Sequence, residues 1–299
     1  LQVSRVGVPV ALPAQAEAIG GFSLDMWATV VDRSGIVRAV AFTGAKVGDQ
    51  WPGSRVISAQ KANTANAFSL TGLALSTANL YSAVQPGGSL FGLQESNPVD
   101  PAVAYGGNAD DYGTVNDFMV GKRIGGVNVF GGGVALYDAT GALIGAVGVS
   151  GDSSCADHNI AWKVRDGLAL DFIPGGVDPA SGTDNIVYDI DGSGVSASGW
   201  GHPQCSPEAT AIGNALPTTN PISVVAPGER ERLIHERRSV GKRPAIAATA
   251  FWLGPFSGVC FSSAFRTSLG QANTGRTRRF VICWILSTVF TSKGLAMAT

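Results

Sequence analysis

The 299-residue sequence predicts an α+β fold in which helices cover a single antiparallel sheet. Two segments, 27–42 and 131–151, each contain an apolar run, a D-x-x-G turn and a second apolar run, which is the pattern of a β-hairpin. Segments with helical spacing lie between and after these hairpins. This order favours strands paired as hairpins, with the helices packed against their sheet.

The composition indicates a compact, soluble globular protein. Of the residues, 45% are hydrophobic and 14% are charged, which argues against general disorder. Residues 1–227 carry a formal charge of −9, so this part has no electrostatic footprint for nucleic acid. The longest apolar run, Phe280 to Phe290, is too short for a membrane span, which needs about 20 residues.

Four segments are expected to be helical. The clearest is 54–69, where a face of mostly small residues recurs at helical spacing and can pack closely on a sheet. Helices are also expected at 9–20, at 73–84 before the Pro86-Gly-Gly stop signal, and at 156–170. Residues 96–125 form a long Gly-, Pro- and Asp-rich loop of the kind that is usually functional or ordered by contacts.

We expect three regions along the chain. Residues 1–173 form the α+β domain, and 174–227 form a Gly/Pro-rich extension that packs on it, with one short strand at 185–190. Residues 228–299 carry a formal charge of +8 and no aspartate, and their apolar residues show no steady period. This tail is either a disordered or non-native segment without a selected function, which we favour, or a basic segment that binds an acidic partner.

Glycines leave the last strand of the second hairpin without side chains at Gly145, Gly148 and Gly151. A backbone or a flat ligand can approach such a surface closely. We therefore expect either a flat ligand or another subunit to lie against this strand.

Three motifs in order resemble the GlcG/HbpS-type haem-binding family. They are the VVD-x-x-G hairpin at 30–37, the K-A-x-T-A helix at 61–65, and the G-G hairpin that ends in GA-x-GVSG at 131–151. The resemblance covers about residues 15–170. The chain resembles the longer, exported branch of the family, in which an inserted loop precedes the central hairpin.

The resemblance implies a profilin-like α+β fold with a five-stranded antiparallel sheet, and a homo-oligomer. It also implies binding of haem, with a corrinoid as the alternative, and a periplasmic or extracellular location, with the cytoplasm as the alternative. A haem-degrading activity is attached to the family on weak grounds. The extension and the tail lie outside the resemblance.

Cys155 and Cys205 are the cysteines of the first 227 residues, and each has a histidine three positions away. A disulfide that ties the extension to the domain is the interpretation we favour. A zinc site that also uses His158 and His202, or two unrelated thiols, are the alternatives.

His158 is the candidate axial ligand to haem iron, or a proton shuttle. Together with Asp157 it is also the candidate acid/base pair of an enzyme. The structural alternatives are a histidine that bonds to nearby backbone and an aspartate that caps the helix.

Four further residues are candidates for cofactor binding. Lys61 would pair with a haem propionate, with Thr64 one turn along the same helix face, and Tyr105 or Tyr112 would supply a phenolate to iron. The alternatives are a surface lysine or an internal ion pair for Lys61, and packing anchors for the tyrosines. No dinucleotide-binding glycine pattern, P-loop or nucleophile elbow is present.

These observations predict a soluble binding protein for haem or a related tetrapyrrole, non-catalytic or weakly catalytic. The alternatives are an enzyme acting on haem or a small organic acid, and a structural or sensory accessory domain that acts through its oligomer interface.

Overall fold

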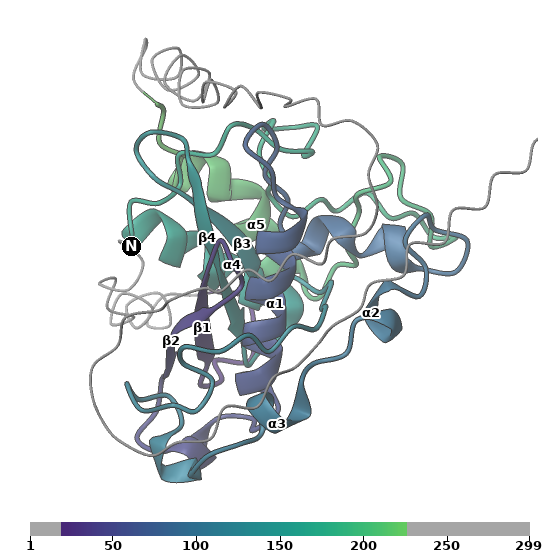
Figure 1. The fold of residues 1–299 in the computed structure, drawn as a ribbon. Coiled ribbons are helices and arrows are strands. Elements are labelled where there is room, and N and C mark those ends of the chain that lie inside the picture. Colours follow the sequence, from purple (N-terminus) through teal and green to yellow (C-terminus); the bar gives the residue numbers. More distant parts are fainter. Residues whose placement is uncertain (1–18, 226–299) are drawn as a thin grey trace, which may run out of the picture. The chain divides into compact units, whose positions relative to one another are not determined.

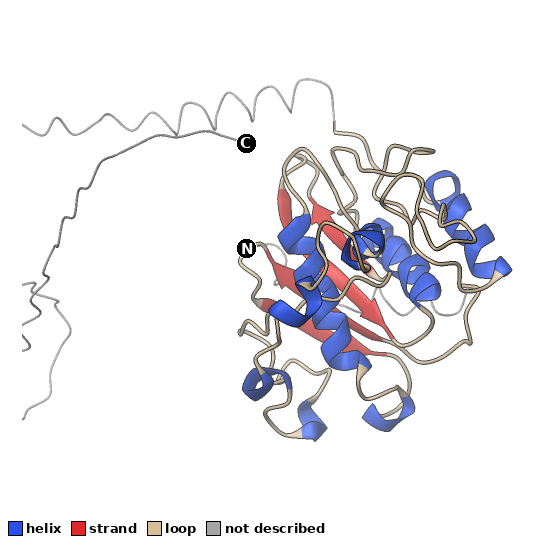
Figure 2. Ribbon diagram, turned by 90° about the vertical axis from the view of Figure 1, so that its right-hand side faces the viewer, coloured by secondary structure: helices blue, strands red, loops and turns tan. Residues whose placement is uncertain are grey.

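The computed structural model describes residues 19–225, all of which belong to one compact unit. Four strands form one antiparallel sheet in the order β2-β1-β4-β3. Their bounds are β1 Trp27–Asp32, β2 Val37–Phe42, β3 Gly133–Tyr137 and β4 Leu143–Ser150. Figure 1 shows the sheet with α1 beside it, and Figure 2 shows the same strands in red between blue helices.

Both predicted hairpins are confirmed, and their turns share one chemistry. Asp32 and Asp138 each accept the backbone N–H groups two and four residues ahead through one carboxylate oxygen. The glycine of each D-x-x-G turn, Gly35 or Gly141, has a φ near +75°, which favours glycine.

Two long helices lie on opposite faces of the sheet. Helix α1, Ser54–Phe68, packs its alanines against Trp27, Val31 and Ala146. Helix α4, Ser154–Gly167, packs on the alternate residues of the same strands. This alternation follows from the two-residue period of a strand. The helices expected at 54–69 and 156–170 are therefore present, the second beginning and ending two to three residues earlier.

The glycine-bare surface of β4 is covered by α1. A Cβ atom added at Gly148 would lie 2.0 Å from the Ser58 carbonyl oxygen, and one added at Gly133 would lie 2.5 Å from the Lys61 carbonyl oxygen. At Gly145 the close neighbour is the carbonyl oxygen of Val31 on β1. The expectation of a flat ligand or second subunit on this surface is wrong, because the protein's own backbone occupies it.

Short turns take the place of some expected elements. In the 73–84 segment two 3₁₀ turns, η5 Thr77–Leu80 and η6 Ser82–Val84, replace the expected helix. Here the Asn79 side chain accepts from the Ser76 backbone and hydroxyl, a local bond that competes with helix formation. The remaining short elements are η4 Val47–Asp49, α2 Leu93–Ser96, α3 Pro101–Ala104 and η7 Ala109–Asp111.

The extension contains a helix that was not expected. Helix α5, Pro207–Thr219, begins with the Ser206 hydroxyl accepting the Ala209 N–H and with Pro207 in the first turn, where proline is favourable. The strand expected at 185–190 is wrong, since that segment makes only isolated bridges, Val187 with Gly201 and Ile190 with Ser196.

Three other expectations have different outcomes. Residues 19–225 contain four strands, so the fifth strand implied by the resemblance is not found there. Of the helix expected at 9–20, only Ile19 and Gly20 are among the described residues, and these two are not helical. The tail from residue 228 lies outside the described residues. The domain boundary at 173/174 stays a prediction.

Candidate functional site

A segment of three glycines, Gly131–Gly133, enters β3 between the N-terminus of α4 and the middle of α1. A Cβ atom at Gly131 would lie 2.3 Å from the Ser154 carbonyl oxygen, and one at Gly132 would lie 3.0 Å from the Lys61 ammonium nitrogen. Side chains are therefore excluded here by close packing. The candidate residues of α1 and α4 meet around this segment.

Lys61 and Asp157 form a buried ion pair across the segment. Their Nζ and Oδ2 atoms are 2.7 Å apart, and each side chain is 3% exposed. The second carboxylate oxygen of Asp157 accepts the N–H of Asp152. Burial raises the pKa of Asp157 to about 6, although the charge of Lys61 opposes this shift. The helix cap is Ser153, so Asp157 holds the two helices together through Lys61 instead of capping α4.

His158 is fully buried beside this pair. Its Nε2 accepts the N–H of Ile186 at 3.1 Å and lies 3.2 Å from Oδ1 of Asn185. Nδ1 has no partner within residues 19–225. Burial lowers the pKa of His158 to about 4, so the ring is neutral at pH 7.

His202 lies on the other side of the glycine segment. Its Nε2 accepts the N–H of Gly131 at 3.3 Å, and its Nδ1 donates to the Pro203 carbonyl oxygen at 2.7 Å. Its side chain packs beside the rings of Tyr81 and Phe130. Burial lowers the pKa of His202 also to about 4. Both histidines of the described residues are thus neutral groups that join the extension to the domain.

Thr64 is buried on α1, one turn beyond Lys61. Its hydroxyl donates to the Gln60 carbonyl oxygen and accepts the N–H of Asn128. Thr64 therefore joins α1 to the 127–130 segment, and both hydrogen bonds of its hydroxyl are to other groups of the protein.

The two candidate tyrosines lie in the long loop, away from the glycine segment. Tyr112 stacks on Arg55 at 3.6 Å and donates to the backbone oxygens of Tyr105 and Gly106. Arg55 also forms a buried ion pair with Asp117. These contacts order the loop, which makes Tyr112 a packing anchor.

Tyr105 differs from Tyr112 because its side chain points to solvent, with 64% of the residue exposed. Phe118, 38% exposed, lies over the two glycines that follow Tyr105, and the Lys122 ammonium lies over the Phe118 ring. Within residues 19–225 the Tyr105 hydroxyl makes no hydrogen bond, whereas the Tyr105 backbone oxygen accepts one from Tyr112. Phe118 and Lys122 were not predicted, because nothing in their spacing links them to Tyr105.

Cys155 and Cys205 are joined in a disulfide, which is the interpretation that the sequence favoured. Their sulfurs are therefore not thiolate ligands for zinc in this structure. Within residues 19–225 no group of three or more histidines, cysteines and carboxylates is arranged to hold a metal ion.

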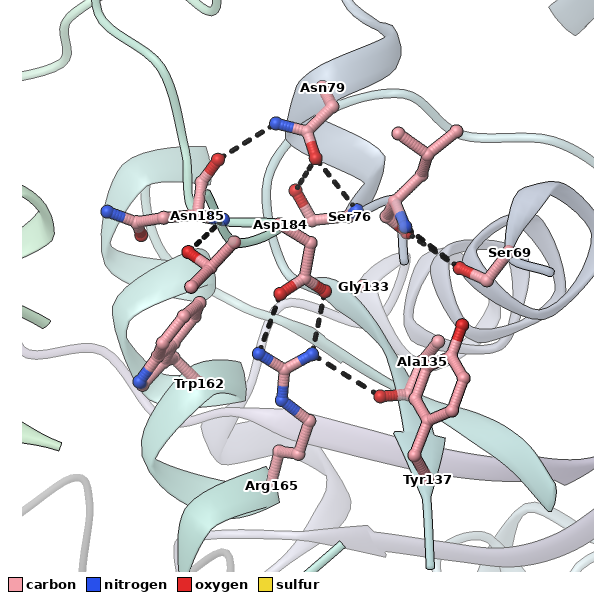
Figure 3. Close-up of polar contacts among 12 residues, drawn as sticks. Ser69, Ser76, Asn79, Gly133, Ala135, Tyr137, Trp162, Arg165, Asp184 and Asn185 are labelled. Carbon is pink, nitrogen blue, oxygen red and sulfur yellow. Dashed lines mark hydrogen bonds and ion pairs between the residues drawn. The ribbon is translucent and has the colours of Figure 1, made fainter. Parts of the chain in front are cut away.

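A third buried ion pair, between Arg165 of α4 and Asp184, anchors the extension. Figure 3 shows the Arg165 guanidinium facing the Asp184 carboxylate, with Trp162 beside it. The neighbouring Asn185 accepts from Asn79 through its backbone oxygen and donates to Gly213. This network was not predicted, and no sequence spacing could have indicated it, since its members come from four separate segments.

A family model described as haem degrading protein HbpS-like matches residues 10–166, slightly more than half of the chain. The chain therefore belongs to the HbpS-like haem-degrading protein family, and the resemblance inferred from its motifs is confirmed.

Two solved structures are similar to this chain. One is the crystal structure of a PduOC:heme complex, at 24% identity and a TM-score of 0.37, covering 56% of this chain and 88% of that chain. The other is Klebsiella pneumoniae protein ORFY, of the family DUF336, at 25% identity and a TM-score of 0.38, covering 56% and 90%. Comparison with curated proteins gave no match. None of the helices within residues 19–225 is long and apolar enough to cross a membrane.

Proposed function

We propose that this protein binds haem or a related tetrapyrrole, and that it is non-catalytic or weakly catalytic. Membership of a family described as haem degrading supports the ligand class. The observation that links the proposal to particular residues is the exposure of Tyr105, which is followed by two glycines that pack against Phe118, with the Lys122 ammonium over the Phe118 ring.

The residues around Tyr105 fit the chemistry of haem. A phenolate oxygen is a known axial ligand to haem iron, and an exposed hydroxyl is accessible to a large macrocycle. The Phe118 ring offers an apolar surface to the porphyrin, and the Lys122 ammonium offers a positive charge to a propionate. Tyr105 would therefore hold the iron, with Phe118 and Lys122 positioning the ring. Bound haem would supply redox and oxygen chemistry at this surface.

The buried residues support a non-catalytic role. Asp157 is paired with Lys61, and His158 accepts a backbone N–H with none of its surface exposed. An acid/base pair must lie within hydrogen-bond reach of a substrate. The alternative, an enzyme using Asp157 and His158, would need the α4 N-terminus and the extension to separate first. It predicts a turnover that His158→Gln abolishes in a folded protein.

The location and assembly also remain proposals. The Cys155–Cys205 disulfide supports an oxidising compartment, periplasmic or extracellular, with the cytoplasm as the alternative. We propose a homo-oligomer on the family resemblance alone; sedimentation of the purified protein would measure its size. An assembly that forms without a spectral response to haem would favour the structural or sensory alternative.

Titration with haemin tests the proposed ligand. We expect a shifted Soret band with saturable binding, and a raised melting temperature, because a ligand that binds the folded state stabilises it. A parallel titration with a cobalt corrinoid tests the alternative tetrapyrrole. No spectral change and no thermal shift with either compound would overturn the proposed function.

The assignment of Tyr105 has its own test. Tyr105→Phe removes the phenolate and keeps the ring, so haemin affinity should fall at least about tenfold, a loss of about 1.4 kcal/mol of binding free energy. Tyr81→Phe, a tyrosine elsewhere on the domain, is the matched control and should bind like wild type. Binding that is intact in wild type and equal in both variants would remove Tyr105 as the ligand and leave haem binding standing.

A further inference from the structure

The two sulfurs of the disulfide lie in different environments. Cys155 has none of its surface exposed, whereas Cys205 is an exposed residue of the loop that leads into α5. A thiolate that attacks a disulfide must reach a sulfur along the bond axis, so access decides which sulfur is attacked. Of this pair, Cys205 is the residue that is exposed to solvent and therefore the one that an incoming thiol can approach.

Both sulfurs lie at the N-terminus of the 14-residue helix α4. Cys155 is the second residue of that helix, and its N–H donates to the Cys205 sulfur at 3.2 Å. The Ser154 hydroxyl lies 3.6 Å from the same sulfur. The dipole of a helix stabilises negative charge at its N-terminus and favours the thiolate form of a cysteine there. The helix therefore stabilises either cysteine as the thiolate that reduction produces.

We propose that Cys155–Cys205 is a thiol-exchange site, at which a small or protein thiol attacks Cys205. The attacking thiolate forms a new S–S bond to Cys205 while the Cys155–Cys205 bond breaks, and the electron pair leaves on Cys155 as a thiolate. A second thiolate then attacks the outer sulfur of the mixed disulfide. Two thiols are thereby oxidised to one disulfide, and the protein's disulfide is reduced to two thiols.

The disulfide is one of several contacts that hold the extension on the domain. The extension is also held by the Arg165–Asp184 ion pair and by the Asn185 side chain, which donates to the Gly213 carbonyl oxygen. The Asn159 side chain donates to Ala209 of α5. The domain and α5 should therefore stay together when the disulfide opens.

Reduction would act first on the segment 202–205. The Pro203 carbonyl oxygen accepts from His202 and lies 3.5 Å from the Cys155 sulfur. A thiolate on Cys155 would repel this oxygen at that distance. The bond that orients the His202 ring is then weakened, so opening the disulfide loosens a histidine that contacts Phe130 and Tyr81.

The test uses the full chain in glutathione buffers of graded redox ratio. Samples are quenched with acid and alkylated, and their peptides are identified by mass spectrometry, which separates this pair from Cys260 and Cys283. We expect reversible reduction with unchanged far-ultraviolet circular dichroism, and a glutathione adduct on Cys205. A disulfide that stays oxidised until denaturant unfolds the chain, or an adduct on Cys155 alone, would overturn the proposal.

Two single variants provide a matched comparison of the thiols. Cys155→Ala leaves the exposed thiol, and Cys205→Ala leaves the buried one. Iodoacetamide should alkylate Cys205 at least about ten times faster than Cys155. Equal rates in folded variants would contradict the proposed direction of attack, and the wild-type titration decides the question if either variant does not fold.

Discussion

The Arg165 guanidinium meets the Asp184 carboxylate at two points, with Nη1–Oδ2 at 2.6 Å and Nη2–Oδ1 at 2.8 Å. Both side chains are buried. If one of them is removed, water cannot replace it as a hydrogen-bond partner of the remaining charge. This relationship joins helix α4 of the domain to the extension, which lies beyond the residues matched by the family model.

Breaking this pair should destabilise the protein strongly. Asp184→Ala leaves the Arg165 charge buried and unpaired, which costs about 3–5 kcal/mol of unfolding free energy, measured by urea titration. Arg38→Ala breaks the more exposed Arg38–Asp32 pair and should cost less than about 1 kcal/mol. Similar losses in the two variants would contradict the anchoring role of Arg165 and Asp184.

Gly148→Ala tests whether β4 needs a residue without a side chain where helix α1 packs on it. The added methyl would lie 2.0 Å from the Ser58 carbonyl oxygen, so α1 must move, and we expect a loss of about 1–3 kcal/mol. Gly72→Ala is the control, because a Cβ there meets nothing within 4 Å, and it should stay within about 0.5 kcal/mol of wild type. Thermal melts of both variants measure the difference.

The stability that Lys61→Met loses relative to wild type should shrink as the pH falls. The variant leaves the Asp157 carboxylate buried without its cation, a loss of about 3–5 kcal/mol at pH 7. Since the folded pKa of Asp157 is raised above its unfolded value, the folded state binds the extra proton, and part of the loss is recovered between pH 7 and 4. The stability difference between the Lys61→Met/Asp157→Asn double variant and the Asp157→Asn single variant should not change with pH, because neither protein has the Asp157 carboxyl; a difference that changes between pH 7 and 4 would contradict the assignment.

His202 should contribute to acid unfolding. Its folded pKa, about 4, lies below the ordinary 6.5, so the unfolded state binds more protons, and stability is lost as the pH falls from 6.5 to 4. The shift corresponds to about 3 kcal/mol at full extent. In His202→Gln, which keeps an acceptor for the Gly131 N–H, the melting temperature should fall less over this range. The opposite contribution of Asp157 is common to both proteins and cancels in the comparison. An equal fall would show that His202 does not titrate differently on folding.

Local patterns explain why the hairpins and the two long helices were predictable. A D-x-x-G turn is built from bonds of Asp32 or Asp138 to its own next four residues, and helix periodicity is a property of one segment. The helix at Pro207–Thr219 was missed because Gly and Pro were interpreted only as breaks, although proline in a first turn favours a helix.

The sequence by itself determined the α+β class, both hairpins, helices α1 and α4, and the family, because each depends on residues close together in the chain. Only the tertiary structure decided which side chains meet: Lys61 with Asp157, Arg165 with Asp184, and Gly148 with the backbone of α1. Lys61 and Asp157 are 96 residues apart, and no local pattern encodes their contact. Such pairings follow from how the helices pack on the two faces of the sheet, and that packing separated the buried candidates from the exposed Tyr105.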